Sequence, residues 1–198
     1  MLVIGLTGSI AMGKSEAASY LATLGLPVFD SDAEVHKVYN SEAGATLLSP
    51  LVPEATKAGK VDREILTALI MKDSSLLSKL ERLVHAEIRS RREAFLTQAK
   101  NSGAKAAILD IPLLYETGSE TQVDKVIVIS SSAEMQRQRA LARPGMNEDR
   151  LAMVLARQLP DAEKQARADA VIRNNSTIQE LQNQLHALCG QWGLINNA

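Results

Sequence analysis

Short apolar runs alternate with longer amphipathic segments along most of the chain. Continuous apolar runs that lack polar alternation predict buried strands, and five such runs occupy residues 2–7, 27–30, 106–111, 125–130 and 170–173. Strands of this kind are typical of a parallel sheet with both faces covered. Since helical patterns separate the runs, we expect an α/β fold in which helices flank a five-stranded parallel sheet.

A stretch without strand patterns, residues 40–103, separates the second predicted strand from the third. Asp62 precedes one helical pattern as an N-cap, and Ser74 and Ser75 begin a longer one. The longer pattern gathers apolar residues on one helix face, namely Leu76, Leu80, Leu83, Val84 and Ile88. We therefore expect residues 40–103 to be a helical substrate-binding insertion within a single domain of residues 1–198.

A second helical stretch, residues 132–168, lies between the fourth and fifth predicted strands. Pro144 and Gly145 divide it into two helices, and Asn147 is a suitable N-cap for the second. Helical insertions at one edge of a sheet are suited to closing over a substrate. We therefore expect this stretch to be a mobile lid.

The strongest motif is GSIAMGKS at residues 8–15, which fits the phosphate-binding pattern G-x-x-x-x-G-K-[ST]. Gly8 and Gly13 allow the backbone to turn its N–H groups toward a phosphate chain. A helix that begins near Lys14 adds the positive end of its dipole. In such loops the lysine reaches the β- and γ-phosphates, and the hydroxyl, here that of Ser15, is a ligand of Mg²⁺. We therefore expect a P-loop site for a nucleoside triphosphate and Mg²⁺.

The kind of P-loop protein follows from the rest of the sequence. It has neither the N-K-x-D motif of GTPases nor an LSGGQ-like motif of transporter ATPases, and its short chain with two helical insertions favours a small-molecule kinase. Balanced charge, with 22 Lys and Arg against 23 Asp and Glu, argues against a nucleic-acid partner. Two alternatives stay open: a P-loop kinase of nucleosides, nucleotides or shikimate-like acids, and a nucleotide-binding regulator without catalysis.

Composition also bears on location. The single cysteine, Cys189, cannot form an intramolecular disulfide, which favours a reducing compartment. No apolar stretch reaches the ~18 residues needed to span a bilayer, and no basic segment precedes the N-terminal apolar run. We therefore expect a cytoplasmic protein with no membrane partner, and a monomer is favoured.

Carboxylates follow two predicted strands, at the sheet edge where α/β proteins bind ligands. Asp30 and Asp32 close the second strand, and Asp32 is suited to orient an attacking hydroxyl and take its proton. Asp110 ends the third strand, where a carboxylate can hold Mg²⁺ or its water. As alternatives, Asp30 or Asp32 caps the helix that follows, and Asp110 caps a nearby amide.

The predicted lid carries two arginines, Arg139 and Arg143, that are four residues apart and share a helix face. Paired guanidinium groups can close over nucleotide phosphates and neutralise the charge of the transition state. The alternative is a solvated helix face without such a role.

In order along the chain, several segments resemble the dephospho-CoA kinase family nearly end to end. The motifs that carry the resemblance are GLTGSIAMGKS at 5–15, DSDAEVH at 30–36, LVHAEIR at 83–89, DIPLLYE at 110–116, the Q-x-x-R-x-x-x-R pattern at 136–143, a later lid glutamine, Gln158, and ADAVIRNN at 168–175. The chain departs from the family pattern where Ala11 and Met12 replace a common Gly-Ser pair and where Ala86 replaces a proline.

The resemblance implies an enzyme that uses ATP to phosphorylate the ribose 3'-hydroxyl of dephospho-coenzyme A, the last step of coenzyme A synthesis. It implies that Asp32 accepts that hydroxyl and that His85 and Arg89 of the helical insertion hold the acceptor. It also implies that the ATP phosphates are lined by Ala11, Met12, Gly13, Lys14, Ser15 and Glu16.

Overall fold

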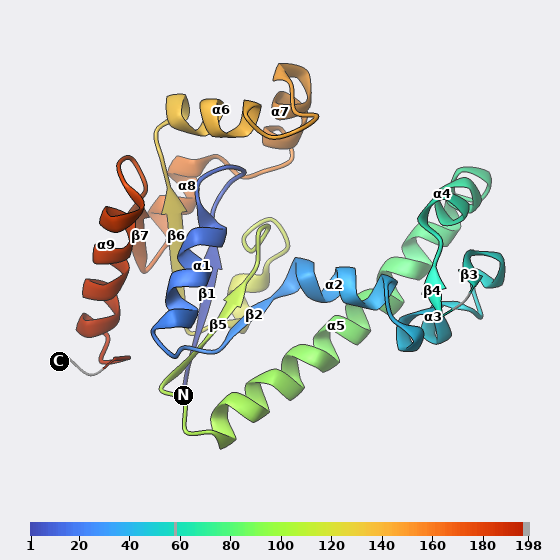
Figure 1. Ribbon diagram of the computed structural model, residues 1–198, viewed down its shortest axis with the longest axis horizontal. Helices are drawn as coiled ribbons and strands as arrows, with labels where there is room; N and C mark the ends of the chain where they lie inside the picture. Colours follow the sequence, from blue (N-terminus) through green and yellow to red (C-terminus); the bar gives the residue numbers. More distant parts are fainter. Residues whose placement is uncertain (58, 196–198) are drawn as a thin grey trace. The chain divides into compact units, whose positions relative to one another are not determined.

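The computed structural model describes residues 1–57 and 59–195 (Figure 1). Residue 58, within the expected helical insertion, lies outside the described residues. Residues 196–198, at the end of the expected domain, lie outside them as well. The chain forms two compact units, and each is described by itself.

The first unit, residues 1–29 and 99–198, is built on a parallel sheet. Its strands stand in the order β2-β5-β1-β6-β7 (Figure 1). β1 pairs in parallel with β5 and β6, and β6 pairs in parallel with β7. The predicted five-stranded α/β fold is thus confirmed. The strands are β1 (Leu2–Thr7), β2 (Val28–Asp30), β5 (Ala106–Asp110), β6 (Lys125–Ser130) and β7 (Ala170–Arg173), with a 3₁₀ turn, η2 (Ser119–Gln122), before β6.

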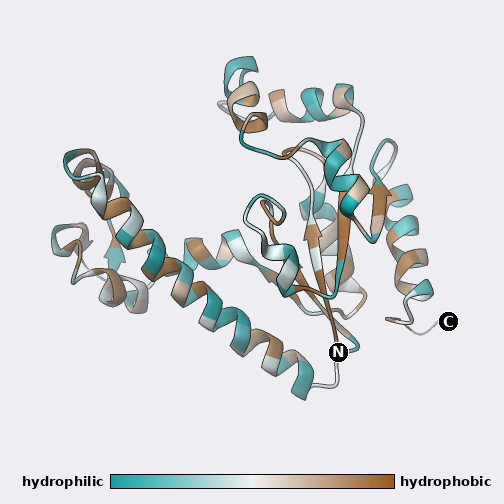
Figure 2. Ribbon diagram, turned by 180° about the vertical axis from the view of Figure 1, so that it is seen from behind, coloured by the Kyte–Doolittle hydropathy of each residue, from teal (hydrophilic) through white to brown (hydrophobic). Residues whose placement is uncertain are grey.

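The sheet is covered because its strands are apolar on both faces. Along β6, Ile127 packs in a cluster with α1 (Lys14–Thr23) and α9 (Ile178–Gln191), whereas its neighbour Val128 packs in another cluster with Leu114. Each such side chain contributes about 1.5–3 kcal/mol on burial. The helices carry more hydrophilic residues than the strands (Figure 2). Within the described residues, no helix is both long and apolar enough to cross a membrane.

The stretch predicted as a lid has three helices, so the prediction of two was wrong. Asn147 caps the second helix as predicted, since its side-chain oxygen accepts the Arg150 N–H at 2.9 Å. The third helix follows Pro160 and has only seven residues, too few for a helical repeat to stand out in the sequence. The helices are α6 (Ala133–Leu141), α7 (Glu148–Leu155) and α8 (Asp161–Arg167).

The second unit, residues 30–98, is helical except for one small ribbon. Two strands pair antiparallel there, with Thr56 opposite Val61. The expectation of no strand between residues 40 and 103 was therefore wrong, because two-residue strands leave no alternation to detect. The elements are α2 (Ser31–Tyr39), α3 (Glu42–Leu48), η1 (Pro53–Ala55), β3 (Thr56–Lys57), β4 (Lys60–Val61), α4 (Arg63–Lys72) and α5 (Ser75–Asn101), whose last residues belong to the first unit.

The long helix α5 carries the predicted apolar face. Leu80 and Val84 are 1% and 4% exposed. Leu76, Leu83 and Ile88 are half-buried against the same cluster. This face forms the core of the second unit, which is separate from the core around the sheet.

Candidate active site

The phosphate loop joins β1 to α1, and two glycines fix its shape. Gly13 is the N-cap of α1 and has a φ of 99°, in the left-handed region that L side chains rarely adopt. A Cβ on Gly13 would lie 2.0 Å from Asn174 Nδ2, and a Cβ on Gly8 would lie 2.5 Å from the Ile129 carbonyl oxygen. The loop therefore needs glycine at both positions of the motif.

Three amide side chains from outside the loop hold its backbone. Gln136 Nε2 donates to the Ile10 carbonyl oxygen at 2.9 Å, and Gln158 Oε1 accepts the Ile10 N–H at 3.1 Å. Asn174 Nδ2 donates to the Met12 carbonyl oxygen at 3.0 Å. These contacts fix the direction in which the loop peptide groups point. Sequence interpretation gave none of the three a role, although each belongs to a motif of the family resemblance.

Ala11 carries backbone strain at the centre of the loop. Its φ of 61° is the one positive value at a non-glycine position among the described residues. Such a conformation costs roughly 1–2 kcal/mol for a residue with a Cβ. The Ala11 methyl group is buried and packs with Ala140 of α6 and Leu151 of α7. This contact with α6 and α7 opposes the strain at a position where the family pattern commonly has glycine.

Lys14 and Asp110 form an ion pair beside the loop. Lys14 Nζ donates a hydrogen bond to Asp110 Oδ1 at the end of β5, and the Asp110 side chain is 4% exposed. Ser15 and Glu16 lie exposed in the first turn of α1. Hydroxyl and carboxylate oxygens are the donors that Mg²⁺ prefers, so the donor chemistry of Ser15 and Asp110 fits a magnesium ion.

Arg139 and Arg143 differ in their surroundings. Arg139 Nη1 donates to the Asn174 carbonyl oxygen at 3.0 Å and to Ser131 Oγ at 3.4 Å. The Asn174 side chain in turn holds the loop backbone, so Arg139 is connected to the loop indirectly, through Asn174. Arg143 is exposed near the end of α6. The structure thus links Arg139, but not Arg143, to the phosphate loop.

A buried ion pair joins Glu116 to Lys164 of α8. Glu116 Oε1 accepts the Leu159 N–H at 2.8 Å and lies 2.8 Å from Lys164 Nζ. Lys164 is fully buried. Burial by itself raises the pKa of the Glu116 carboxyl, but Lys164 and the Leu159 N–H outweigh it and hold the pKa below its ordinary value. Since Leu159 follows Gln158, this pair supports a residue that holds the loop.

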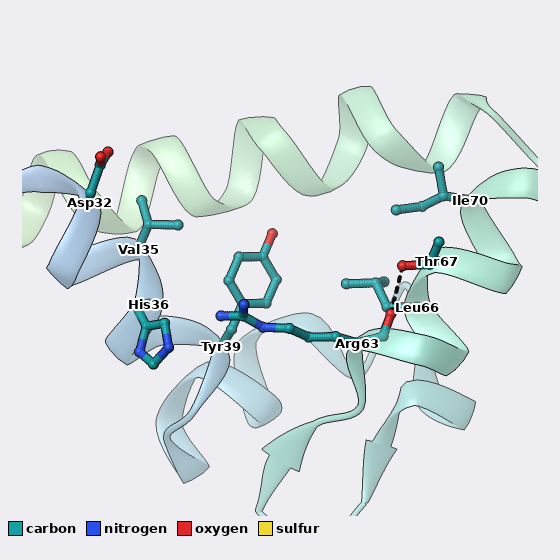
Figure 3. Close-up of a pocket in the computed structure, with 8 residues that line it drawn as sticks. All are labelled: Asp32, Val35, His36, Tyr39, Arg63, Leu66, Thr67 and Ile70. Atoms are coloured by element: carbon teal, nitrogen blue, oxygen red, sulfur yellow. Dashed lines mark hydrogen bonds between the residues drawn. The ribbon is translucent and has the colours of Figure 1, made fainter. Parts of the chain in front are cut away.

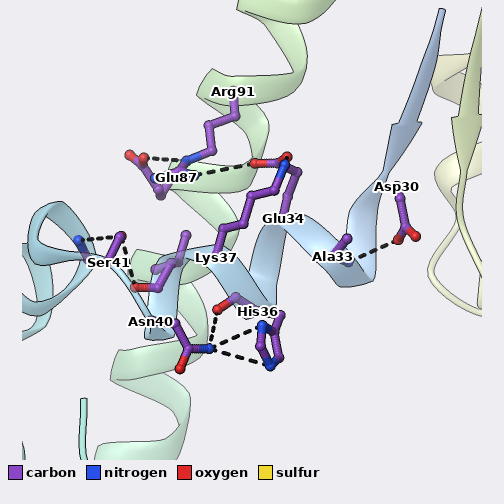
Figure 4. Close-up of polar contacts among 11 residues, drawn as sticks. Asp30, Ala33, Glu34, His36, Lys37, Asn40, Ser41, Glu87 and Arg91 are labelled. Atoms are coloured by element: carbon purple, nitrogen blue, oxygen red, sulfur yellow. Dashed lines mark hydrogen bonds and ion pairs between the residues drawn. The ribbon is translucent and has the colours of Figure 1, made fainter. Parts of the chain in front are cut away.

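Asp30 and Asp32 have different roles in the second unit. Asp30 Oδ1 accepts the Ala33 N–H at 2.9 Å and so caps α2 (Figure 4). Asp32 lies in the first turn of α2, and its exposed side chain lines a pocket (Figure 3). The structure therefore assigns the cap to Asp30 and leaves the Asp32 carboxylate available to a ligand.

We call this cavity of about 440 Å³ the α2–α4 pocket. The Arg63 guanidinium lies 5.8 Å from the centre of the Tyr39 ring, within the range of a cation–π contact. His85 and Arg89 are exposed on α5 and do not line the pocket, so it does not bring them to Asp32. Sequence interpretation missed Arg63 and Tyr39. The lining residues are Asp32, Val35, His36, Tyr39, Arg63, Leu66, Thr67 and Ile70 (Figure 3).

An ion-pair network joins α2 to α5 (Figure 4). Arg91 donates to Glu87 at 2.7 Å and to Glu34 at 3.3 Å, and Lys37 donates to Glu34 at 2.6 Å. Burial raises the pKa of the Glu34 carboxyl, but Lys37 and Arg91 together hold it below its ordinary value. Since α2 also carries Asp32, the network orients the helix that presents this carboxylate.

A glycine-bounded phosphate loop between a buried strand and a helix, inside a parallel sheet with helical insertions, defines a P-loop kinase. Solved structures share this fold. Shikimate kinase from Acinetobacter baumannii superposes with a TM-score of 0.56 at 20% identity, over 98% of this chain and 96% of that one. At this identity the likeness shows the fold alone.

Relatives of higher identity show the family. The sequence model of the dephospho-CoA kinase family matches residues 2–180, and the chain belongs to that family. Dephospho-CoA kinase of Nitrobacter winogradskyi is 47% identical over 188 residues, 95% of this chain and 94% of its own. The enzyme of Agrobacterium fabrum is 46% identical over 193 residues, 98% and 99% of the two chains. The structure of TT1252 from Thermus thermophilus has a TM-score of 0.78 at 32% identity, over 96% of this chain and 97% of that one.

Proposed function

We propose that this protein is a dephospho-CoA kinase, which transfers the γ-phosphoryl group of ATP to the ribose 3'-hydroxyl of dephospho-coenzyme A. The products are coenzyme A and ADP, and the reaction is the final step of coenzyme A biosynthesis. The observation that carries the proposal is the family match over residues 2–180, which spans both the phosphate loop and the helix that bears Asp32.

On the donor side, the loop N–H groups from Ala11 to Glu16 bind the ATP phosphates, with the α1 dipole adding to the attraction. Lys14 exchanges the Asp110 carboxylate for the β- and γ-phosphate oxygens. Ser15 and Asp110 would hold Mg²⁺, and the bound ion would neutralise negative charge on the nucleotide phosphates. Arg139 stabilises the charge that develops as the bond to the γ-phosphorus breaks, and Arg143 binds the nucleotide phosphates from the same helix.

On the acceptor side, Asp32 orients the 3'-hydroxyl and receives its proton as the new O–P bond forms. The exposure of this carboxylate and the capping of α2 by Asp30 instead support this role. His85 and Arg89 hold other parts of the acceptor from α5, as the family resemblance implies.

These roles assign different segments of the chain to the two substrates. We propose that residues 40–103 bind the acceptor and residues 132–168 close over ATP, within one kinase domain of residues 1–198. The contacts of Gln136 and Gln158 with the loop support the second assignment. The single, buried cysteine supports a cytoplasmic location, and we propose that the enzyme is monomeric.

An assay with a matched acceptor tests the proposal. ADP release is measured with ATP, Mg²⁺ and either dephospho-coenzyme A or its 3'-deoxy analogue. We expect rapid ADP release with dephospho-coenzyme A and only slow background hydrolysis with the analogue. Equal rates with the two compounds, or no ADP with either, would contradict the proposal.

A further inference from the structure

We infer that Arg63 is a specificity-determining residue that binds the pyrophosphate group of the acceptor inside the α2–α4 pocket. This inference rests on the proposed function and adds to it the place of the acceptor's charged centre. Neither the family resemblance nor the predicted residues His85 and Arg89 points to Arg63.

The pocket presents its chemical groups in a fixed order along α2 (Figure 3). Asp32, His36 and Tyr39 are four and then three residues apart, so they share one face of the helix. At 1.5 Å per residue, His36 lies about 6 Å and Tyr39 about 10 Å along the axis from Asp32. Arg63 of α4 extends over the Tyr39 ring, at 5.8 Å from its centre. The order from Asp32 is thus carboxylate, imidazole, guanidinium.

The apolar residues of the pocket continue this order on α4. Leu66 is 7% exposed and Ile70 is half-buried, and both line the pocket beyond Arg63 (Figure 3). A ligand that fits this arrangement carries a hydroxyl at one end, an anionic group next to it and a weakly polar chain beyond.

Dephospho-coenzyme A has its groups in that order. The ribose carries the 3'-hydroxyl, the 5'-pyrophosphate is attached to the same ring, and the pantetheine chain extends from the pyrophosphate. The 3'-oxygen and the nearest phosphorus are separated by a few bonds across the ribose, a span comparable with one turn of helix. With the hydroxyl at Asp32, the nearer phosphate therefore lies beside His36, one turn along α2. The farther phosphate extends toward Arg63, so that pantetheine lies along Leu66 and Ile70.

The Arg63 guanidinium is free to bind an anion. No carboxylate in the described part of residues 30–98 forms an ion pair with it, whereas Arg91 in the same unit is occupied by Glu34 and Glu87. Burial raises the pKa of the Tyr39 phenol, so the ring stays neutral and offers its face to the cation. The cation–π contact uses none of the guanidinium N–H groups as hydrogen-bond donors, so Arg63 can make a bidentate contact with phosphate oxygens.

Steady-state kinetics of Arg63→Gln and Arg63→Lys test the inference, with Lys72→Gln as the matched control. Lys72 lies exposed at the other end of α4, outside the pocket, so its variant removes the same charge from the same helix. For Arg63→Gln we expect the KM of dephospho-coenzyme A to rise about 10- to 100-fold, the cost of a lost charge-assisted contact. The KM of ATP should stay within about twofold.

The remaining outcomes separate binding from a general defect. Arg63→Lys should recover part of the affinity, because it restores the charge without the planar fork, and Lys72→Gln should resemble the wild type. An unchanged KM for dephospho-coenzyme A in Arg63→Gln would overturn the inference, as would an equal rise in both KM values. If the wild type fails to phosphorylate dephospho-coenzyme A, the proposed function fails instead.

Discussion

The phosphate loop and the α2–α4 pocket offer a ligand two different kinds of surface. The loop offers backbone N–H groups, and two glycines together with three amide side chains from outside the loop hold its backbone in place. The pocket offers side chains on two helices, and Asp32, His36 and Arg63 are all exposed.

This difference predicts which substitutions lower the stability of the fold and which lower enzyme activity. A backbone site depends on the residues outside the loop that hold its backbone, so changes in those residues should weaken folding and phosphate binding together. A side-chain site depends on the groups themselves. Changes in the pocket should therefore alter turnover or KM and leave the fold intact.

The largest effect is expected for Asp32→Asn, which leaves no carboxylate to receive the hydroxyl proton. We expect kcat to fall about 10²- to 10⁴-fold, while ATP affinity and the thermal transition remain those of the wild type. Asp30→Asn is the matched control, because asparagine also caps helices and preserves the contact with the Ala33 N–H. The measurement is kcat for both variants beside ATP titration; equal losses in the two would remove the distinction between these aspartates.

A large loss of stability is expected for Lys164→Met. Lys164 forms the buried ion pair with Glu116 that supports the phosphate loop. Removing one member of a buried ion pair costs about 3–5 kcal/mol, because Glu116 keeps its charge without its partner. Arg137→Met breaks the exposed pair with Glu148 and should cost less than about 1 kcal/mol. Urea unfolding of both variants measures the difference, and similar midpoints would show that burial of the pair does not matter.

Acidic pH should weaken the ion pair between Glu116 and Lys164. A carboxyl whose pKa is lower in the folded state than its ordinary value of 4.5 stabilises the protein above that value, and its contribution disappears as pH falls through the folded-state pKa. The free energy of unfolding of wild type minus that of Glu116→Gln should therefore be constant at neutral pH and shrink below about pH 4.5. Chemical unfolding at a series of pH values measures it; a difference that grows in acid has the wrong sign.

The smallest effect is expected for Ala11→Gly. Glycine relieves the strain of a φ of 61°, but it removes a methyl group packed on Ala140 and Leu151 and adds freedom to the unfolded chain. These contributions oppose each other, so the free energy of unfolding should change by less than about 1 kcal/mol. Thermal unfolding checks this, and a larger loss would mean that the methyl contact with α6 and α7 outweighs the strain.

Local patterns predicted most of the fold. The five strands and the cap at Asn147 follow from runs of a few residues, and the structure has them. The ribbon at Thr56 and Val61 and the short helix α8 were missed, because such small elements carry no repeat.

The candidate site was predictable only in part. The phosphate loop is a local motif, but the competition between Asp30 and Asp32 for the helix cap is decided by backbone geometry that sequence does not display. Arg63 belongs to a pocket lined by residues of both α2 and α4, and Lys164 lies in a stretch that resembles a solvated helix yet is fully buried. Both depend on contacts between residues far apart in the chain.

The decisive measurement is the identity of the product. The enzyme is incubated with ATP, Mg²⁺ and dephospho-coenzyme A, and the product is identified by mass spectrometry and ³¹P NMR. We expect one ADP for each coenzyme A formed, with the new phosphate on the ribose 3'-oxygen. ADP without coenzyme A, or a phosphate on any other oxygen, would contradict it.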